Sequence, residues 1–303
     1  MPSPPSLPPV LAIDVGATKF EAALVDGDGH VGRRHRAATA GAAGHGELAE
    51  RLVGVARDAL SGVTTPPAMV GVGSAGPFLE AGETIAPVNL PAWDGFPIRA
   101  ELAAALDLEV EVAGDAQALA LGEGWLGAAQ GQDNYLAMVV STGVGGGLVV
   151  DGSLLRGRLG NAGHLGHVVV EPDGRHCGCG GRGCVEAEAS GTAIAAITGA
   201  DPASAPEAIR QRTGTLVGRA VASVMATLDL PLALVAGGVA LGYGEVFFEA
   251  AQRELSERAR LTFVREARIV PALLGDTGPL LGAAAVAHRA LRAAGTDLGG
   301  EGG

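Results

Sequence analysis

The sequence predicts an α/β protein made of two related halves, and three observations support this prediction. Apolar runs with the spacing of strands alternate with helical stretches along most of the 303 residues, an order typical of α/β folds. A chain of this length suggests about two domains. Residues 11–27 align without gaps with residues 136–152 and are identical at six of the seventeen positions, so we expect each half to begin with the same strand–turn–strand unit.

The first half of the chain reads as strands separated by helices and glycine-rich turns. Residues 11–25 predict two strands joined by a tight turn, and residues 47–60 predict a helix whose apolar side chains fall close to one face. The other elements expected here are a strand at 69–77 that ends in a glycine-rich turn, a helix at 98–106, a strand at 108–114 and a helix at 116–129.

The second half repeats this pattern. Residues 135–152 predict a strand, a glycine loop and a second strand. The elements expected after it are helical stretches at 187–198 and 204–228, a strand at 232–240 with a glycine pair, a helix at 244–260, a strand at 267–272 and a helix at 278–292. If the two halves face each other, their hairpin turns converge on one cleft between domains, where ligands commonly bind.

Composition and charge exclude several classes of protein. Lys and Arg total 21 against 33 Asp and Glu, a net charge of −12, which disfavours a nucleic-acid partner. No segment has the pattern of a signal peptide, and no run approaches the ~20 apolar residues that span a bilayer. We therefore expect a cytoplasmic protein without a membrane partner. The three cysteines lie within eight residues of each other, which indicates a reduced compartment or a bound metal rather than disulfides.

The first candidate binding motif is the turn between the two strands of residues 11–25. Backbone N–H groups around Gly16 can approach phosphate oxygens closely, and the Thr18 hydroxyl can donate to the same oxygens. Asp14, at the end of a buried strand, could hold hydrated Mg²⁺, and Lys19 is the only lysine beside twenty arginines. These features favour a phosphate site over the alternative, a plain hairpin turn with a capping aspartate.

A second glycine loop occupies the equivalent turn of the repeat. Residues 141–147 offer hydroxyls and free N–H groups to another phosphate, with Thr142 and Gly143 at the turn. Alone this loop is a weak signal, and its pairing with the first loop strengthens it. Gly237 and Gly238 follow a strand, and they either let an adenine ring approach the backbone or simply end that strand.

Asp115 follows Gly114 at the end of the strand at 108–114. A carboxylate at this position can accept the proton of a substrate hydroxyl and so activate the hydroxyl as a nucleophile. An aspartate directly before a helix is also a common N-cap. The residues alone leave both functions open.

The most specific pattern combines cysteines with a histidine. Three thiolates and one imidazole form a set suited to tetrahedral Zn²⁺, and a closed set of four ligands is structural because it leaves no position for water. The alternative is three unrelated buried cysteines. The candidate ligands are Cys177, Cys179, Cys184 and one of His164, His167 and His176. His176 adjoins a cysteine and would need a strained geometry, so His167 is favoured.

Together these motifs, in this order, resemble the ROK family of sugar kinases, sugar-kinase-like proteins and repressors. The resemblance covers about residues 11–290. The matching segments are 14–19 and 141–147 for the two phosphate motifs, 160–167 and 177–191 for the family signature with its zinc site, and 234–240 for the adenosine strand. The resemblance implies an actin-like ATPase fold, in which two RNase-H-like α/β domains enclose an active-site cleft.

The domain boundaries expected from this fold divide the chain unevenly. The small α/β domain is expected to hold residues 9–114 plus 284–297 and to carry the first phosphate loop. The large α/β domain is expected to hold residues 115–283, with the second phosphate loop, the zinc site and the adenosine strand.

The resemblance further implies that the γ-phosphate of ATP, bound with Mg²⁺, is transferred to a sugar hydroxyl, usually the 6-hydroxyl of a hexose. Asp115 matches the catalytic base of the family. The matched sugar-binding positions are Gly76, Asn89, Asp115, His164, His167 and Glu186. The matched ATP- and Mg²⁺-binding positions are Asp14, Gly16, Thr18, Lys19, Thr142, Gly143, Gly237 and Gly238. The matched ligands of a structural Zn²⁺ are His167, Cys177, Cys179 and Cys184. A homodimer is the usual form of the family.

Two positions depart from the family pattern, and both fall in the expected sugar pocket. Gly114 stands where the family has an asparagine, and His164 stands where it has a glutamate. We expect a glucokinase-like hexose kinase; the alternatives are a kinase for an N-acyl hexosamine, mannose or fructose, and a non-catalytic sugar sensor. A DNA-binding repressor is disfavoured by the acidic charge and by the ten residues that precede Leu11, too few for a helix-turn-helix.

Overall fold

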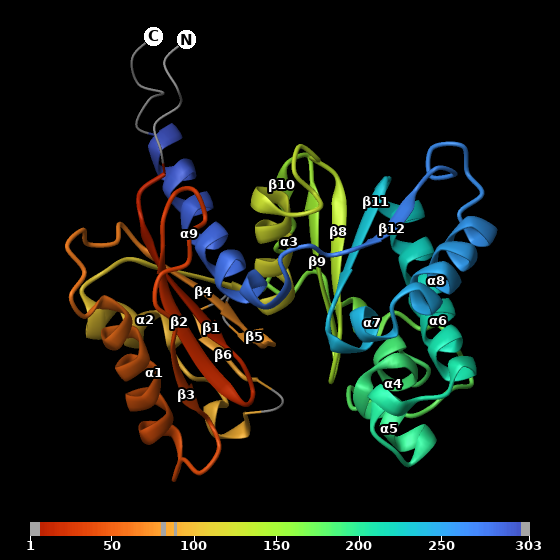
Figure 1. The fold of residues 1–303 in the computed structure, drawn as a ribbon, viewed down its shortest axis with the longest axis horizontal. Helices are drawn as coiled ribbons and strands as arrows, with labels where there is room; N and C mark the ends of the chain where they lie inside the picture. Colours follow the sequence, from red (N-terminus) through yellow and green to blue (C-terminus); the bar gives the residue numbers. More distant parts are fainter. Residues whose placement is uncertain (1–6, 80–82, 88–89, 298–303) are drawn as a thin grey trace. The chain divides into compact units, whose positions relative to one another are not determined.

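The computed structural model describes residues 7–79, 83–87 and 90–297, and the chain divides into two units (Figure 1). Unit 1 comprises Met1–Leu126, Arg156–Asn161 and Asp276–Gly303. Unit 2 comprises Gly127–Leu155 and Ala162–Gly275.

Unit 1 is built on a five-stranded mixed sheet. Its strands, in spatial order, are β3 (His35–Ala38), β2 (Lys19–Val25), β1 (Val10–Val15), β4 (Val70–Ser74) and β7 (Val110–Gly114). The hairpin β1–β2 and the pair β2–β3 are antiparallel, whereas β1, β4 and β7 run parallel. The three parallel strands therefore end at the same edge of the sheet.

Unit 2 contains a second sheet with the same topology. Its strands, in spatial order, are β10 (Ser153–Leu154), β9 (Val144–Val150), β8 (Tyr135–Val140), β11 (Leu232–Ala236) and β12 (Arg268–Pro271). Strands β8, β9 and β10 are antiparallel neighbours, and β8, β11 and β12 run parallel. The predicted pair of related α/β halves is thus confirmed, and the fold is that of the actin-like ATPases.

Helices cover both sheets. In unit 1 they are α1 (His45–Leu60), α2 (Ile98–Leu106), α3 (Asp115–Leu126) and α9 (Gly278–Asp297). In unit 2 they are α4 (Val185–Ala189), α5 (Gly191–Thr198), α6 (Glu207–Leu228), α7 (Gly238–Tyr243) and α8 (Glu245–Arg258). The short remaining elements are the strands β5 (Phe78–Leu79) and β6 (Thr84–Ile85) and the 3₁₀ turns η2 (Pro91–Trp93), η3 (Leu165–His167), η4 (Pro202–Ser204) and η5 (Gly275–Thr277).

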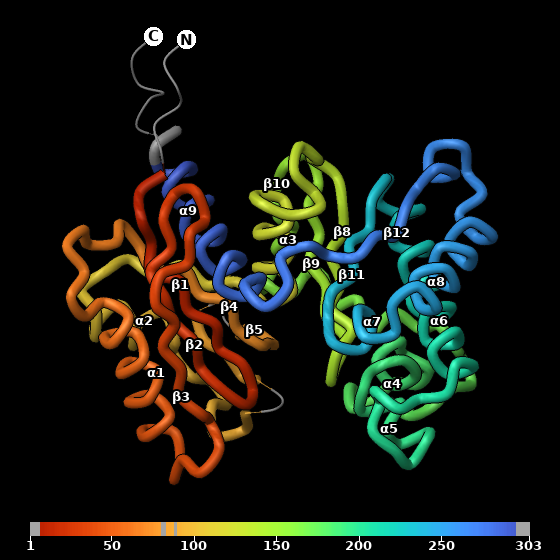
Figure 2. The backbone as a smooth tube through the Cα atoms, in the orientation of Figure 1, coloured from red at the N-terminus to blue at the C-terminus, as the bar shows by residue number. Residues whose placement is uncertain are grey.

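The core of unit 1 lies on both faces of its sheet. On one face, α1 and α2 pack over the strands, and Trp93 stacks between Phe20 and Phe96 with centroid distances of 5.1 and 4.1 Å. On the other face, α9 packs against β1 and β4 (Figure 2). This approach requires glycine at position 71, where a Cβ would lie 1.9 Å from the Ala283 carbonyl oxygen.

Unit 2 has its own core between the sheet and two long helices. Buried residues of α6 and α8, such as Val217 and Phe247, join the same apolar cluster as Leu136 and Met138 of β8. Helix α6 is the longest helix of this unit, and it packs extensively against α8.

Two details of the sequence prediction are corrected by the structure. The segment 232–240 is not one strand: β11 ends at Ala236, and residues from Gly238 onward form α7. Residues 115–126 fall in unit 1 rather than with the second half, since α3 packs on α9 through a cluster of Ala113, Ala118 and Val286. Residues 156–161 and 276–283 also belong to unit 1. Within the described ranges, no helix is both long and apolar enough to cross a membrane.

Candidate active site

The ends of three parallel strands stand level in unit 1. Val15 of β1 pairs with Ser74 of β4, and Ser74 pairs with Gly114 of β7. The segments that follow these residues are the first predicted phosphate loop, the turn at Gly76 and the helix that begins with Asp115. Ligands of open α/β sheets bind at this carboxyl edge of the strands, so the register brings three predicted site segments to one edge.

The first phosphate loop, residues 16–18, is held in shape by backbone and side-chain bonds. The Gly16 N–H donates to the Lys19 carbonyl at 3.1 Å and closes the turn. Thr39 fastens the loop from β3's end: its hydroxyl donates to the Ala17 carbonyl at 2.6 Å and its N–H to the Thr18 carbonyl at 3.0 Å. The Thr18 side chain is exposed. A preformed loop with an outward hydroxyl fits the predicted phosphate contact.

Asp14 is the predicted Mg²⁺ residue, and its carboxyl is difficult to ionise. Burial, and then the charge of Asp115, raise the pKa of Asp14 to about 7. A divalent cation would offset both effects, because it favours the charged form of a neighbouring carboxylate. The two carboxylates therefore fit the Mg²⁺ that accompanies ATP.

Glu21 was not singled out by the sequence analysis, although it lies beside the first loop. Its carboxylate is almost fully buried and forms ion pairs with Lys19 at 2.7 Å, with Arg36 at 2.9 Å and with Arg34. Burial alone would raise the pKa of Glu21, but these three cations lower it to about 2. Lys19, predicted as a phosphate-binding cation, is thus also a partner of Glu21, and a carboxylate inside an apolar strand was the signal for this pair.

Asp115 is the first residue of α3 and its side chain is exposed. Its Oδ1 accepts the Ala116 N–H at 2.7 Å. The neighbouring Gln117 is buried; its Oε1 accepts the Gly114 N–H at 3.0 Å and its Nε2 donates to the Gly160 carbonyl at 2.9 Å. An accessible carboxylate on a firmly held helix start can act as a general base.

The turn at Gly76 is also firmly held. The Gly76–Pro77 peptide bond is cis. Asn161 clamps the next residue: the Phe78 N–H donates to Asn161 Oδ1, and Asn161 Nδ2 donates to the Phe78 carbonyl, both at 2.8 Å. Asn89, the other predicted sugar-binding residue of this region, lies outside the described residues. Gln117 and Asn161 were missed by the sequence analysis, because their partners are distant along the chain.

In unit 2 the second phosphate loop lies beside the glycine pair. Val139 of β8 pairs with Ala236 of β11, so Thr142 and Gly238 follow neighbouring strand ends. A pocket of about 370 Å³ opens there. Its lining residues are Ser141, Thr142, Gly191, Thr192, Asp201, Pro202, Ala203, Gly238, Val239, Gly242 and Tyr243. A pocket of this size, with a glycine loop on one wall, fits part of a nucleotide.

Glu186, a predicted sugar-binding residue, contacts the second phosphate loop. Its Oε2 accepts the Val144 N–H at 2.9 Å. The exposed rings of His164 and His167 lie with centroids 6.0 Å apart in the segment around η3. Unit 2 therefore places Glu186 against the loop that is expected to bind phosphate, and it brings His164 and His167 close to each other.

The predicted metal ligands converge on one point. One ligand atom from each of four residues lies within 4.8 Å of the other three, and these residues are His167, Cys177, Cys179 and Cys184. Cys177 Sγ is 3.7 Å from His167 Nδ1, and Cys179 Sγ is 3.8 Å from Cys184 Sγ. Burial raises the pKa of Cys184 to about 12, as do its hydrogen bonds to the other two thiols. The donor set is that of a structural zinc site.

The alternative histidines do not join this set. Arg182 Nη2 lies 2.8 Å from His176 Nε2, and His164 is outside the cluster of four. The loop closes tightly because Gly183 adopts a φ of +69°, and a Cβ there would lie 1.6 Å from the Glu171 carbonyl oxygen. The choice of His167 over its neighbours therefore agrees with the arrangement of the side chains.

Comparison with known proteins gives consistent matches over nearly the whole chain. The ROK family matches residues 10–290. The glucokinase of Thermotoga maritima is 32% identical over 308 residues, which cover 91% of this chain and 96% of that protein. The N-acetylmannosamine kinase of Citrobacter koseri is 38% identical over 251 residues, which cover 77% of this chain and 84% of that protein. The crystal structure of a ROK hexokinase from Thermus thermophilus is similar with a TM-score of 0.82 at 34% identity, and the match covers 94% of this chain and 99% of that one.

Proposed function

The chain belongs to the ROK family and is an ATP-dependent sugar kinase, and we propose that its acceptor is the 6-hydroxyl of a hexose, with glucose preferred. The single observation that carries phosphoryl transfer at this site is the level ending of β1, β4 and β7, which brings Asp115 to the same sheet edge as the first phosphate loop. The similarity to the glucokinase of Thermotoga maritima supports glucose as the acceptor. A base beside a phosphate site is the arrangement that phosphoryl transfer to a hydroxyl requires.

We assign the proton transfer to Asp115. Its exposed carboxylate would accept the proton of the attacking hydroxyl, and the bonds of Gln117 to Gly114 and Gly160 hold the start of α3 in place. The clamp of Asn161 on Phe78 fixes the turn at Gly76 beside it. Positioning of this kind supplies much of the catalysis in phosphoryl transfer.

We assign ATP binding to both glycine loops. Thr18 and the backbone N–H groups near Gly16 would bind phosphate in unit 1, and Asp14 would bind the accompanying cation. In unit 2 we assign nucleotide binding to the pocket beside Thr142 and Gly238. Mg²⁺, when bound with ATP, neutralises charge that develops on the phosphates.

We assign a structural function to the zinc site. Four closed ligands leave no position for substrate. His167 would bind the metal through Nδ1, which faces Cys177, and this leaves Nε2 for a sugar hydroxyl. The metal would therefore orient a sugar-binding side chain rather than act on the phosphate.

A second acceptor, an N-acyl hexosamine, is favoured by one local observation. Gly114 replaces the asparagine of the family pattern, and the three atoms nearest to a Cβ there belong to Gln117, at 3.5–3.6 Å. The space of a missing side chain could hold an acyl group. The N-acetylmannosamine kinase of C. koseri, at 38% identity, supports the same alternative.

A sugar panel tests the proposal. ADP formation is measured with ATP, Mg²⁺ and each of glucose, mannose, fructose and N-acetylmannosamine, and ³¹P NMR locates the phosphate on the product. We expect the highest kcat/KM with glucose and a 6-phosphate product. Turnover restricted to N-acetylmannosamine would establish the second acceptor. Sugar binding without any turnover would instead identify a sensor. The homodimer expected from the resemblance stays a prediction, which light scattering in solution measures.

A further inference from the structure

Glu188 is a buried carboxylate that the proposed chemistry does not use. It lies on α4 and is only 2% exposed. Its Oε1 accepts the Arg175 N–H at 2.6 Å, and its Oε2 accepts from Arg212 Nη2 at 2.6 Å. Arg212 Nη1 also donates to the Glu188 carbonyl at 2.9 Å. Two bonds hold this buried carboxylate and a third holds the backbone of the same residue, so Glu188 fixes its surroundings closely.

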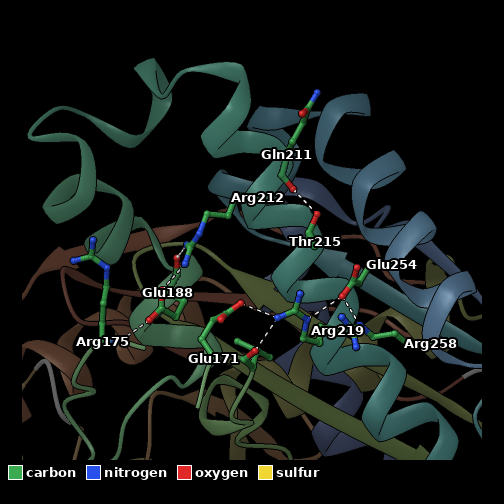
Figure 3. A network of polar contacts seen from close by, with 10 residues as sticks. Glu171, Arg175, Glu188, Gln211, Arg212, Thr215, Arg219, Glu254 and Arg258 are labelled. Atoms are coloured by element: carbon green, nitrogen blue, oxygen red, sulfur yellow. Dashed lines mark hydrogen bonds and ion pairs between the residues drawn. The ribbon is translucent and has the colours of Figure 1, made fainter. Parts of the chain in front are cut away.

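Arg212 lies on the long helix α6, which packs against α8. Arg219 follows it two turns later on the same side of that helix. Arg219 Nη1 donates to the Val170 carbonyl at 2.9 Å and to Glu171 at 2.7 Å. Figure 3 shows both arginines extending from α6, Arg212 toward Glu188 and Arg219 toward Glu171. These two glutamates lie on either side of the cysteine loop, residues 177–184, so α6 bonds to the chain on both sides of that loop.

The bonds between Arg212 and Glu188 affect the short helix that follows Cys184 and carries Glu186. Helix α4 has five residues, from Val185 to Ala189, and it directly follows Cys184. Glu186 lies two residues before Glu188 on this short helix and reaches the Val144 N–H at 2.9 Å. A helix this short has little stability of its own. Its orientation must come from contacts such as those of Glu188.

We propose that Arg212 is a positioning residue for the acceptor sugar, which acts through Glu188 to orient Glu186. The inference rests on the proposed function, because Glu186 is assigned there as a sugar-binding residue. Arg212 touches neither the predicted zinc ligands nor the nucleotide pocket. Its loss should therefore affect the sugar most and ATP less, since Glu186 reaches the second phosphate loop only through its bond to the Val144 N–H.

Replacement of the arginine tests this inference. Arg212→Met keeps an unbranched side chain similar to the aliphatic part of arginine and removes both bonds to Glu188. We expect the KM for the sugar, and its dissociation constant measured by calorimetry without ATP, to rise about tenfold, the usual scale for groups that orient a ligand-binding residue. The KM for ATP should rise less than the KM for the sugar, because Glu186 touches the second phosphate loop through one backbone N–H. Equal sugar affinity in variant and wild type would overturn the proposal.

Arg258→Met is the matched control. Arg258 forms an ion pair with Glu254 on its own helix, and Figure 3 shows it in the same network. Within the described residues it bonds to Glu254 and not to the cysteine loop or to α4, so both KM values should be unchanged. If the control raises the sugar KM as much as Arg212→Met does, general loss of stability accounts for the effect and the proposal fails.

Two further variants complete the test. Arg212→Lys covers the case in which the methionine variant does not fold: lysine keeps the charge but lacks the planar group that bonds to both the carboxylate and the carbonyl. Its sugar KM should lie between those of wild type and Arg212→Met, and a wild-type value would contradict the proposal.

Glu186→Gln separates the assignment of Glu186 as a sugar-binding residue from the positioning effect of Arg212. If it leaves sugar affinity unchanged, the assignment of Glu186 is wrong; if it weakens the sugar while the Arg212 variants do not, only the positioning inference is wrong.

Discussion

Asp14 and Glu21 are direct partners across the β1–β2 hairpin, yet their surroundings shift the pKa values of the two carboxyl groups in opposite directions. Burial and the charge of Asp115 raise the pKa of Asp14 to about 7. Glu21 is also buried, but Arg36, Lys19 and Arg34 lower its pKa to about 2. Glu21 therefore stays charged and is neutralised by the three cations beside it. Asp14 would need a bound cation to stay charged at neutral pH.

This relationship predicts how stability depends on pH. The folded-state pKa of Asp14 is raised above its ordinary value of 3.8. The stability that its protonated form contributes is therefore complete below about pH 4 and is lost as the pH rises through about 7. Urea unfolding of the protein without nucleotide or Mg²⁺ should show Asp14→Asn gaining stability over wild type between pH 5 and pH 8. Glu50→Gln, which changes an exposed carboxylate of α1, is the control. A difference that is the same at both pH values would contradict the assignment.

The zinc assignment predicts a coupled loss of metal and stability. Cys179→Ser removes one of the four converging ligand atoms. Zinc content by native mass spectrometry and the thermal midpoint should fall together, because formation of such a site is part of folding. His176→Gln changes a neighbouring histidine outside the cluster and should retain full zinc. A wild-type protein that carries no metal, or a Cys179→Ser variant that keeps it, would refute the site.

The second glycine loop predicts a selective effect on ATP. Thr142→Val removes an exposed hydroxyl, while the Thr142 carbonyl still accepts from the Thr192 hydroxyl at 2.9 Å, so the loop should keep its shape. A hydrogen bond to a charged phosphate is worth about 1.5–3 kcal/mol, which corresponds to a fall of about tenfold or more in kcat/KM for ATP. The sugar KM should hardly change. Thr215→Val, on the surface of α6, controls for the substitution, and unchanged ATP kinetics would count against this loop.

Much of the fold follows from local sequence patterns. The two hairpins were predictable because the repeat places the same strand–turn–strand pattern in both halves, and the alternation of apolar runs located most helices. The place of α3 was not predictable, since it depends on Ala118 packing against Val286 of α9, far along the chain. The break of residues 232–240 at Gly237, whose φ is +100°, was also beyond a pattern of apolar residues.

The candidate site was also predictable only in part. The predicted zinc ligands lie close together in sequence, so their spacing indicated the cluster of side chains that the structure contains. Glu188 and Gln117 bond to groups on other segments, Arg212 and Gly160. No local pattern marks such pairs, because only the folded chain brings them together. Glu21 was detectable as a charge in an apolar strand, but its three cations were not.

The two departures from the family pattern predict a weaker affinity for glucose, or a shifted preference, relative to family members that have both residues. Gly114 and His164 together replace an amide and a carboxylate that would anchor sugar hydroxyls, and fewer polar anchors discriminate less between sugars. A Cβ is accommodated at position 114, since it would make ordinary contacts with Gln117 at 3.5–3.6 Å. The double variant Gly114→Asn with His164→Glu should lower the KM for glucose, measured beside each single variant. A wild-type enzyme that already binds only glucose tightly, and a double variant that is worse, would show that His164 is itself a competent sugar ligand.

The most direct test of the proposed mechanism is the maximal rate of Asp115→Asn with saturating ATP, Mg²⁺ and the preferred sugar. The substitution is nearly isosteric and leaves an oxygen to accept the Ala116 N–H, which Asp115 Oδ1 accepts at 2.7 Å, so the circular dichroism spectrum and thermal midpoint should be retained. Loss of a general base costs on the order of 10²–10⁴ in rate, and we expect kcat to fall within that range while both substrates still bind. A fall of less than tenfold, with the fold intact, would contradict the assignment and leave Asp115 as the first residue of a helix rather than the base of a kinase.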